Sequence, residues 1–280
     1  MLRRMVFSCV ILLVVCPGRL SAQGTLVVVG GGDTGPDIVA PTLALAGGSR
    51  AVVAVLPQAS AEPDAGDGSV AMWLEAGARE ALKVSFDDRA AAAATLKRAT
   101  LIWMPGGDQN RFMKAIAGTG LDDVIRARYQ AGVVVGGTSA GAAILSNAMI
   151  TGEADLKSIT SGATEIADGL GLWPEVIVDQ HFLTRQRTNR LLSAVLDRPS
   201  LVGVGIDEST GVIVHGTTFD VIGKSSVVVI DARNAAMART DGTRHPAASG
   251  IAVAVLRAGQ TYSLTTRRIT ARRAGPPAPR

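Results

Sequence analysis

The chain has 280 residues, of which 47% are hydrophobic, and its 28 basic and 24 acidic residues give a formal net charge of +4. A chain of this length can bury a sufficient core without disulfides or a structural metal. The excess of positive charge lies mainly near the two ends of the chain, so nothing in it indicates a nucleic-acid partner.

The first 22 residues have the pattern of a secretory signal peptide. Arg3 and Arg4 precede an apolar run, residues 6–15, that is too short to span a bilayer. The small residues before position 23 offer a cleavage site, and we place it after Ala22. We therefore expect residues 1–22 to be removed and the mature protein to be secreted or periplasmic, with no membrane segment.

Removal of this leader changes the charge and the cysteine content. The leader holds three arginines and no acid, so 25 basic residues remain against 24 acidic ones. It also holds both cysteines, Cys9 and Cys16. The mature chain therefore has no disulfide and no thiol nucleophile, which excludes cysteine-dependent glutamine amidotransferases.

In the first half of the mature chain, short β-branched runs alternate with helical stretches. Strands separated by helices are typical of a parallel sheet that is covered on both faces. We expect strands at 25–29, 50–56, 82–86, 100–104 and 132–136, and helices at 69–79, 88–97, 109–117, 121–130 and 142–145.

The second half of the chain changes character, because its strands lie close together with hairpin-length links. We expect strands at 176–179, 201–206, 211–215, 219–222, 225–230, 251–256 and 262–264, and one helix at 184–196. The whole predicts an α/β fold with a doubly wound, mostly parallel sheet and antiparallel edge strands. It forms one domain over residues 23–270, and the proline-rich residues 271–280 are expected to be a disordered tail.

Residues 137–142 have the sequence Gly-Thr-Ser-Ala-Gly-Ala and join a predicted strand to a predicted helix. A strand, a G-x-S-x-G turn and a helix describe a nucleophile elbow, which lifts one serine hydroxyl clear of a sheet. The glycines relieve the tight bend, and the start of the helix favours developing negative charge. Ser139 is therefore the candidate nucleophile for acyl transfer.

The carboxyl ends of the predicted strands bring several loops to one edge of the sheet, where open α/β folds place their sites. These loops are 30–35, 105–110, 137–141 and 179–182. The first matches G-x-G-x-x-G, but no acid follows the second strand to bind a ribose, so a dinucleotide cofactor is rejected. We expect this loop to form a glycine-rich wall of the cleft.

A serine nucleophile needs a base, and the mature chain has three histidines. His181 directly follows a predicted strand and can reach the edge that carries Ser139, whereas His215 and His245 are expected in surface loops. The acid that orients the imidazole is Glu208 or its neighbour Asp207, between which spacing does not decide. The histidines are scattered without ligand spacing, so no metal site is expected.

Three arginines, Arg185, Arg187 and Arg190, crowd the predicted helix after His181. Guanidinium groups suit the recognition of carboxylates, so beside a catalytic histidine they indicate an acidic substrate. The alternative interpretation is a solvated basic helix face.

Four blocks of the chain resemble cyanophycinase, which groups with the aspartyl dipeptidases among the serine peptidases. They are residues 105–109, 137–142, 179–190 and 205–208, in this order, and the likeness covers most of residues 25–230. The resemblance implies a class I glutamine amidotransferase-like (flavodoxin-like) three-layer fold without a cofactor. It also implies a peptide or polypeptide substrate rich in aspartate and arginine, cleaved to β-aspartyl-arginine dipeptides, and a homodimer.

The same resemblance implies roles for individual residues. Ser139 would be the nucleophile, His181 the base and Glu208, rather than Asp207, the third member of the triad. The backbone N–H of Ala140 and of Gly106 or Gly107 would form the oxyanion hole. The substrate would be held by Gln109, Asp179, Gln180, Arg185, Arg187 and Arg190.

Three alternatives remain. One is a secreted aspartyl or isoaspartyl dipeptidase that acts on short acidic peptides. Another is an α/β-hydrolase-type esterase with His215 or His245 as base, although the chain order Ser, His, Glu differs from the order in that fold. The last is a binding protein that keeps the fold without catalysis.

Overall fold

The computed structural model of the protein describes residues 23–238 and 244–271. The predicted leader, residues 1–22, lies outside this part of the chain, as do residues 272–280 of the predicted tail. Within the described ranges, no helix has the length and apolar character needed to cross a bilayer.

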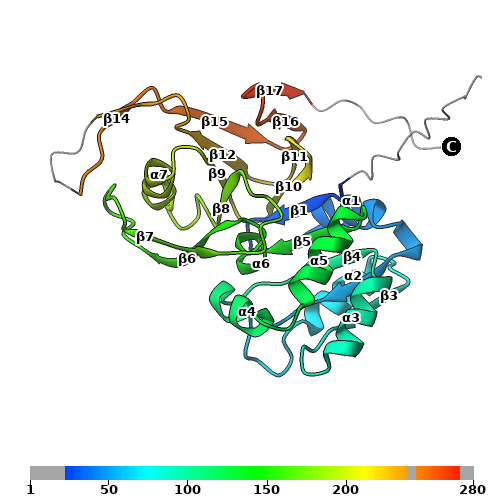
Figure 1. Ribbon diagram of the computed structural model, residues 1–280. Coiled ribbons are helices and arrows are strands. Elements are labelled where there is room, and N and C mark those ends of the chain that lie inside the picture. Colours follow the sequence, from blue (N-terminus) through cyan, green and yellow to red (C-terminus); the bar gives the residue numbers. More distant parts are fainter. Residues whose placement is uncertain (1–22, 239–243, 272–280) are drawn as a thin grey trace, which may run out of the picture.

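A nine-stranded sheet forms the centre of the molecule (Figure 1). Its strand order is β17-β16-β11-β10-β1-β5-β4-β2-β3. The parallel half consists of β1 (Leu26–Val29), β2 (Val52–Val55), β3 (Glu80–Lys83), β4 (Leu101–Met104) and β5 (Val134–Thr138). The antiparallel half consists of β10 (Thr210–His215), β11 (Thr218–Gly223), β16 (Gln260–Ser263) and β17 (Arg268–Ala271).

Helices cover both faces of the parallel half because its strands are apolar on both sides. On β1, Leu26 and Val28 face one cluster of buried residues, and Val27 and Val29 face the other. The first cluster is completed by α3 (Arg89–Arg98), α4 (Gln109–Ile116), α5 (Leu121–Gln130) and α6 (Ala140–Ala143). The second is completed by α1 (Pro36–Leu45) and α2 (Asp67–Glu75), with a short 3-10 turn at Gly48–Arg50.

A second sheet packs against the antiparallel half of the first. Its order is β15-β12-β9-β8, with β8 (Val176–Gln180) parallel to β9 (Val202–Ile206), and β12 (Ser226–Asp231) and β15 (Ala252–Arg257) antiparallel. One face joins the large core shared with the first sheet, and α7 (Thr188–Asp197) covers the other. Two small hairpins flank it: β6 (Ala148–Ala154) with β7 (Thr164–Asp168), and β13 (Ala236–Met237) with β14 (Ala248–Ser249).

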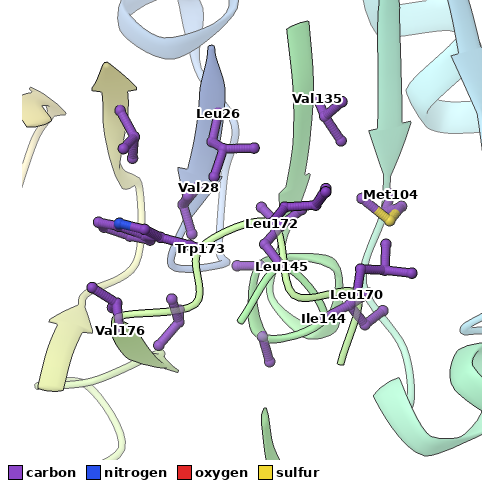
Figure 2. Packing of buried hydrophobic residues seen from close by; sticks show 14 of the residues in the cluster. Leu26, Val28, Met104, Val135, Ile144, Leu145, Leu170, Leu172, Trp173 and Val176 are labelled. Atoms are coloured by element: carbon purple, nitrogen blue, oxygen red, sulfur yellow. The ribbon is translucent and has the colours of Figure 1, made fainter. Parts of the chain in front are cut away.

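The two sheets share one continuous core near the middle of the molecule. Figure 2 shows side chains of β1, β4 and β5 gathered around the residues that follow α6 and those that lead into β8. The labelled members are Leu26, Val28, Met104, Val135, Ile144, Leu145, Leu170, Leu172, Trp173 and Val176. The ring of Trp173 lies 5.8 Å from Phe219 of β11, in an edge-to-face arrangement. The segment that enters the second sheet is thus anchored on the first.

The expected three-layer α/β fold with a parallel core and antiparallel strands is confirmed, but several elements differ. The later strands do not form one extended edge, because β8, β9, β12 and β15 form a sheet of their own. The helix expected at 184–196 begins only at Thr188, and the strand expected at 82–86 lies at Glu80–Lys83. Ala271, which was assigned to the tail, ends β17.

The sequence did not predict β13, β14 and β17, nor two larger features. The first, α1, holds Pro36 in its first turn and Pro41 in its interior, and these prolines obscure its helical pattern. The second is the β6–β7 hairpin, whose strands mix polar residues with a glycine and are broken by an irregular register.

The packing of α7 on the second sheet depends on a glycine in β9. A Cβ added at Gly203 would lie 2.7 Å from Val195 Cγ2 and 3.0 Å from Leu191 Cδ1. We expect Gly203→Ala to lower the free energy of unfolding by about 1–3 kcal/mol, as overpacked cores do. Urea denaturation of the parent and the variant measures this difference in the free energy of unfolding.

Gly68→Ala is the matched control, because nothing lies within 4 Å of a Cβ at this position in α2. Alanine favours a helix, so this variant should be as stable as the parent or more stable. Equal urea midpoints for the Gly203 and Gly68 variants would contradict the packing argument.

Candidate active site

The turn between β5 and α6 has the geometry of a nucleophile elbow. Ser139 lies between strand and helix with φ 55° and ψ −117°, a backbone conformation that residues other than glycine rarely adopt. The flanking glycines are required by close backbone packing. A Cβ at Gly141 would lie 1.9 Å from the carbonyl oxygen of Met104, and one at Gly137 would lie 2.6 Å from the backbone of Gly141.

Three side chains from separate parts of the chain form a hydrogen-bonded row. The hydroxyl Oγ of Ser139 lies 2.8 Å from Nε2 of His181, and Nδ1 of His181 lies 2.6 Å from Oε1 of Glu208. Ser139 follows β5 of the first sheet, whereas His181 and Glu208 follow β8 and β9 of the second. The row therefore crosses the junction of the two sheets.

The glycine loop after β1 packs against the far side of this row. A Cβ at Gly31, where φ is +103°, would lie 2.2 Å from Cε1 of His181, and one at Gly32 would lie 2.8 Å from Cβ of Glu208. The His181 amide also donates to the carbonyl oxygen of Gly30 at 2.6 Å. The loop thus lies behind the imidazole and holds it in place. None of its residues lines the cleft beside Ser139, so the expected glycine-rich wall is not part of that lining.

Backbone strain is concentrated around the site. Within the described residues, five residues other than glycine have positive φ, and four of them are Ser139, His181, Gln186 and Ser209. Each such conformation costs on the order of 1–3 kcal/mol and persists only where its surroundings hold it. Here the strain turns the hydroxyl of Ser139 and the ring of His181 toward each other.

Burial tunes the protonation of the imidazole. His181 is 7% exposed, and this burial is the main reason why its pKa is lowered from the usual 6.5. The hydrogen bond that the imidazole donates to Glu208 raises the pKa, and the charges of Arg185 and Arg187 lower it further. The ring is consequently neutral at pH 7 and can accept a proton at Nε2.

A cleft of about 310 Å³ opens beside the Ser139 hydroxyl. Residues 107–110 and Ser139 line it from the first sheet and its helices. The rest of its lining comes from the second sheet, the turn after β8 and the β6–β7 hairpin. Its lining consists of Gly107, Asp108, Gln109, Asn110, Ser139, Thr151, Gly152, Gln180, Arg185, Arg187 and Arg190. A volume of this order suits a few residues of a peptide.

The three arginines differ in their surroundings. Arg190 is buried and binds Asp179 with two hydrogen bonds, of 2.9 Å from Nε and 2.5 Å from Nη2. Arg187 donates to the backbone oxygen of Gln180 at 2.6 Å and also to its side-chain oxygen. Burial and the neighbouring Arg190 charge lower the pKa of Arg187 to about 10, so it stays cationic at neutral pH. Arg185 is exposed at the rim.

Asp179 does not lie where a substrate-binding residue should. It has no exposed surface, it is absent from the cleft lining, and its carboxylate is occupied by Arg190. Nη1 of Arg187 also lies 3.8 Å from Oδ1 of Asp179, so this one carboxylate faces two guanidinium groups and the three arginines leave an excess of positive charge at the cleft. The structure thus brings the predicted Gln109, Gln180 and the three arginines to the cleft, with Asp179 behind them.

The predicted oxyanion donors also lie beside the nucleophile. Ala140 is the first residue of α6, so its N–H has no carbonyl partner within the helix. A Cβ on Gly106 would lie 3.7 Å from the Ser139 hydroxyl oxygen, which places this backbone next to the reacting atom. Gly107 approaches Ala59 so closely that an added Cβ would meet its carbonyl oxygen at 2.3 Å.

The other candidate residues lie elsewhere. His215 is the last residue of β10 and lies at the edge of the sheet opposite Ser139, since its neighbour Val214 pairs with Leu26 at the start of β1. His245 lies near the carbonyl oxygen of Ile159. Asp207, the rival of Glu208, binds the backbone of residues 183 and 184 and not the imidazole.

Sequence reasoning missed several cleft residues. Thr151 and Gly152 come from the unpredicted hairpin, for which the sequence carried no signal, whereas Asp108 and Asn110 flank the predicted Gln109. In the part of the chain that the structure describes, no group of three or more metal-ligating side chains lies together.

Comparisons with known proteins give consistent matches. The profile of peptidase family S51 matches residues 26–222. A cyanophycinase of Geminocystis herdmanii (strain PCC 6308) is 38% identical over 220 residues, which are 75% of this chain and 81% of that protein. A cyanophycinase of Synechococcus elongatus is 35% identical over 261 residues, or 88% of this chain and 81% of that protein.

Solved structures share the fold. A peptidase from an acI-B1 Actinobacterium superposes with a TM-score of 0.66 at 20% identity, covering 87% of this chain and 98% of that one. A putative peptidase E from Listeria monocytogenes EGD-e gives a TM-score of 0.56 at 17% identity, covering 73% and 100%. The fold is therefore of the class I glutamine amidotransferase-like kind. Since the profile match includes Ser139, His181 and Glu208, and the relatives align over most of their length, the chain belongs to peptidase family S51, a family of serine peptidases.

Proposed function

We propose that Ser139, His181 and Glu208 act as a catalytic triad for peptide hydrolysis. The observation that carries this proposal is the row of hydrogen bonds of 2.8 and 2.6 Å beside an arginine-lined cleft. Nε2 of His181 takes the hydroxyl proton as Ser139 attacks the scissile carbonyl. Glu208 accepts a hydrogen bond from Nδ1–H of His181, which fixes the tautomer and stabilises the imidazolium that forms.

The remaining steps use the same groups. The N–H groups of Ala140 and of Gly106 or Gly107 donate to the oxyanion of the tetrahedral intermediate. His181 returns its proton to the leaving amine, which departs and leaves an acyl group on Ser139. Water then attacks the ester, His181 again takes and returns a proton, and the carboxylic acid product is released.

The substrate class follows from the charge of the cleft. Arg185 and Arg187 supply positive charge that no carboxylate of the lining other than Asp108 offsets, and guanidinium groups bind carboxylates in a bidentate manner. Sequence relatives at 35–38% identity are named cyanophycinase. We infer an exopeptidase that cleaves the aspartyl backbone of an arginine-aspartate polymer and releases β-aspartyl-arginine dipeptides.

A second candidate substrate is a short acidic peptide. The cleft volume of about 310 Å³ accommodates a dipeptide as well as the end of a polymer. An aspartyl or isoaspartyl dipeptidase would use the same triad and arginines.

The products decide between these substrates. We expect purified protein to convert an arginine-aspartate polymer into β-aspartyl-arginine. In this polymer each aspartate side chain carries an arginine with a free carboxylate, which Arg185 and Arg187 of the cleft can bind. Mass spectrometry of the digest identifies the product, and Asp-Xaa and isoAsp-Xaa dipeptides are assayed in parallel. Hydrolysis of the dipeptides alone would favour the second candidate, and cleavage of neither would overturn both.

The triad itself is tested by replacement of its members. We expect Ser139→Ala and His181→Ala each to lower kcat by roughly four to six orders of magnitude, because they remove the nucleophile and its base. A fluorophosphonate probe should label Ser139 in the parent protein and not in these variants. His215→Ala is the matched control and should keep kcat within about twofold, since His215 lies at the opposite edge of the sheet. A parent protein that resists the probe would favour a binding function.

The pH profile reports the state of the base. The pKa of His181 is lowered from 6.5, so the neutral, active imidazole persists below that pH and is lost as the pH falls through the lowered value. The acidic limb of kcat/KM should therefore have its midpoint below pH 6.5. Arg185→Gln should move this limb upward, because the Arg185 charge helps to lower the pKa of His181. A parent midpoint above 6.5 would argue against His181 as the base.

A further inference from the structure

Asp207 is a buried carboxylate for which the triad has no use. It is 7% exposed and lies directly before Glu208 in the chain. Its Oδ1 accepts from the amides of Leu183 and Thr184, at 3.1 and 2.9 Å, and from the Thr184 hydroxyl at 2.9 Å. Its Oδ2 accepts from the Ser225 hydroxyl at 2.8 Å. Three of these four bonds hold one segment, residues 182–187.

That segment is a turn between β8 and α7, and it carries two cleft arginines. Three backbone bonds form within it: the amides of Arg185, Gln186 and Arg187 donate to the carbonyls of His181, Leu183 and Phe182, at 2.9, 3.0 and 2.9 Å. The Phe182 amide donates to the Ile206 carbonyl at 3.2 Å, and in the described part of the chain no backbone bond of this kind is made by the amides of Leu183 and Thr184, which bind Asp207 instead. Gln186 adopts a positive φ of 53° within it. A polar, strained turn of this kind keeps its shape only if something outside it supplies further bonds.

Two successive carboxylates therefore hold successive parts of one segment. Glu208 binds the ring of His181, where the turn begins, and Asp207 binds the backbone two and three residues later. Arg185 follows directly, and Arg187 comes two residues after it, both in the lining of the cleft.

We propose that Asp207 is a positioning residue, whose carboxylate fixes the 182–187 turn so that Arg185 and Arg187 meet the substrate carboxylates beside Ser139. The assignment of the arginines rests on the proposed function, whereas the fixing of the turn does not. Asp207 touches none of the reacting groups, so it acts on substrate binding and leaves the attack by Ser139 unchanged.

The charge of Asp207 matches this role. Burial opposes ionisation, but the hydrogen bonds from Thr184 and Ser225 outweigh it and hold the pKa of Asp207 below the usual value. The carboxylate is thus ionised at neutral pH. Asparagine at this position keeps one carbonyl oxygen for the three bonds to residues 183 and 184, and its NH₂ can donate to the Ser225 oxygen. Alanine removes every bond.

The test compares Asp207→Ala with Asp207→Asn in three measurements. For Asp207→Ala we expect KM for the arginine-aspartate polymer to rise at least about tenfold, while the rate of fluorophosphonate labelling at Ser139 stays within about threefold. Amide hydrogen exchange at Leu183 and Thr184 should accelerate at least about a hundredfold. Asp207→Asn should keep KM within about threefold of the parent.

Asp231→Ala is the matched control for loss of a buried carboxylate. Asp231 is 2% exposed and binds Arg233, with Arg267 nearby, at the end of β12 away from the site. This variant should lower the melting temperature and leave KM unchanged. If it raises KM as much as Asp207→Ala does, general loosening explains the effect and the proposal fails.

Other outcomes also decide the matter. An unchanged KM in Asp207→Ala, or labelling that falls in parallel with hydrolysis, would overturn the role in substrate binding. If Asp207→Ala does not fold, Thr184→Val is measured in its place, because this substitution removes only the hydrogen bond from the Thr184 hydroxyl to Asp207. KM for the polymer should then rise a few-fold, and an unchanged KM would overturn the proposal. A parent that neither hydrolyses the polymer nor reacts with the probe refutes the proposed function, and the exchange rates still test whether Asp207 fixes the turn.

Discussion

The close approach of residues 30–32 to the ends of β8 and β9 is the constraint on which the rest of the site depends. A Cβ at Gly30 would lie 2.2 Å from the carbonyl oxygen of Asp207, and one at Gly31 would lie 2.2 Å from the imidazole of His181. The backbone also accepts from the amides of His181 and Ser209, at 2.6 and 2.8 Å. Three glycines in a row thus allow two sheets to meet without side chains between them.

The meeting of two sheets explains how the site can be both strained and well ordered. Ser139 is presented by the first sheet, and His181 and Glu208 by the second, so no single strand pairing fixes their distances. Ser139 and His181 have positive φ values, as does Ser209 directly after Glu208, and packing from both sheets holds these conformations. Large shared cores can support such strain because interiors are closely packed and deform little.

The sequence predicted the parallel half and the site loops because both depend on local signals: apolar runs, turn glycines and the order of four motifs. It did not predict how the later strands divide between sheets. Strands β9 and β10 are separated only by residues 207–209, yet they pair with different partners, because the chain turns sharply where Ser209 has a φ of 52°. The same turn sends Glu208 toward His181 and Asp207 toward residues 183 and 184, which spacing alone does not reveal. The resemblance implied that Asp179 holds the substrate, and the sequence carries no local signal for its pairing with Arg190, eleven residues away.

The three tryptophans are intrinsic fluorophores in two different parts of the core. Trp73 and Trp103 pack edge to face, 5.2 Å apart, on the helix-covered face that lies away from the second sheet. Trp173 instead packs on Phe219 in the core that both sheets share. Its fluorescence therefore responds to separation of the sheets, whereas the emission of the other two responds to melting of the parallel half. Because the triad spans the same junction, the Trp173 signal and the geometry of the triad depend on the same contact between the sheets.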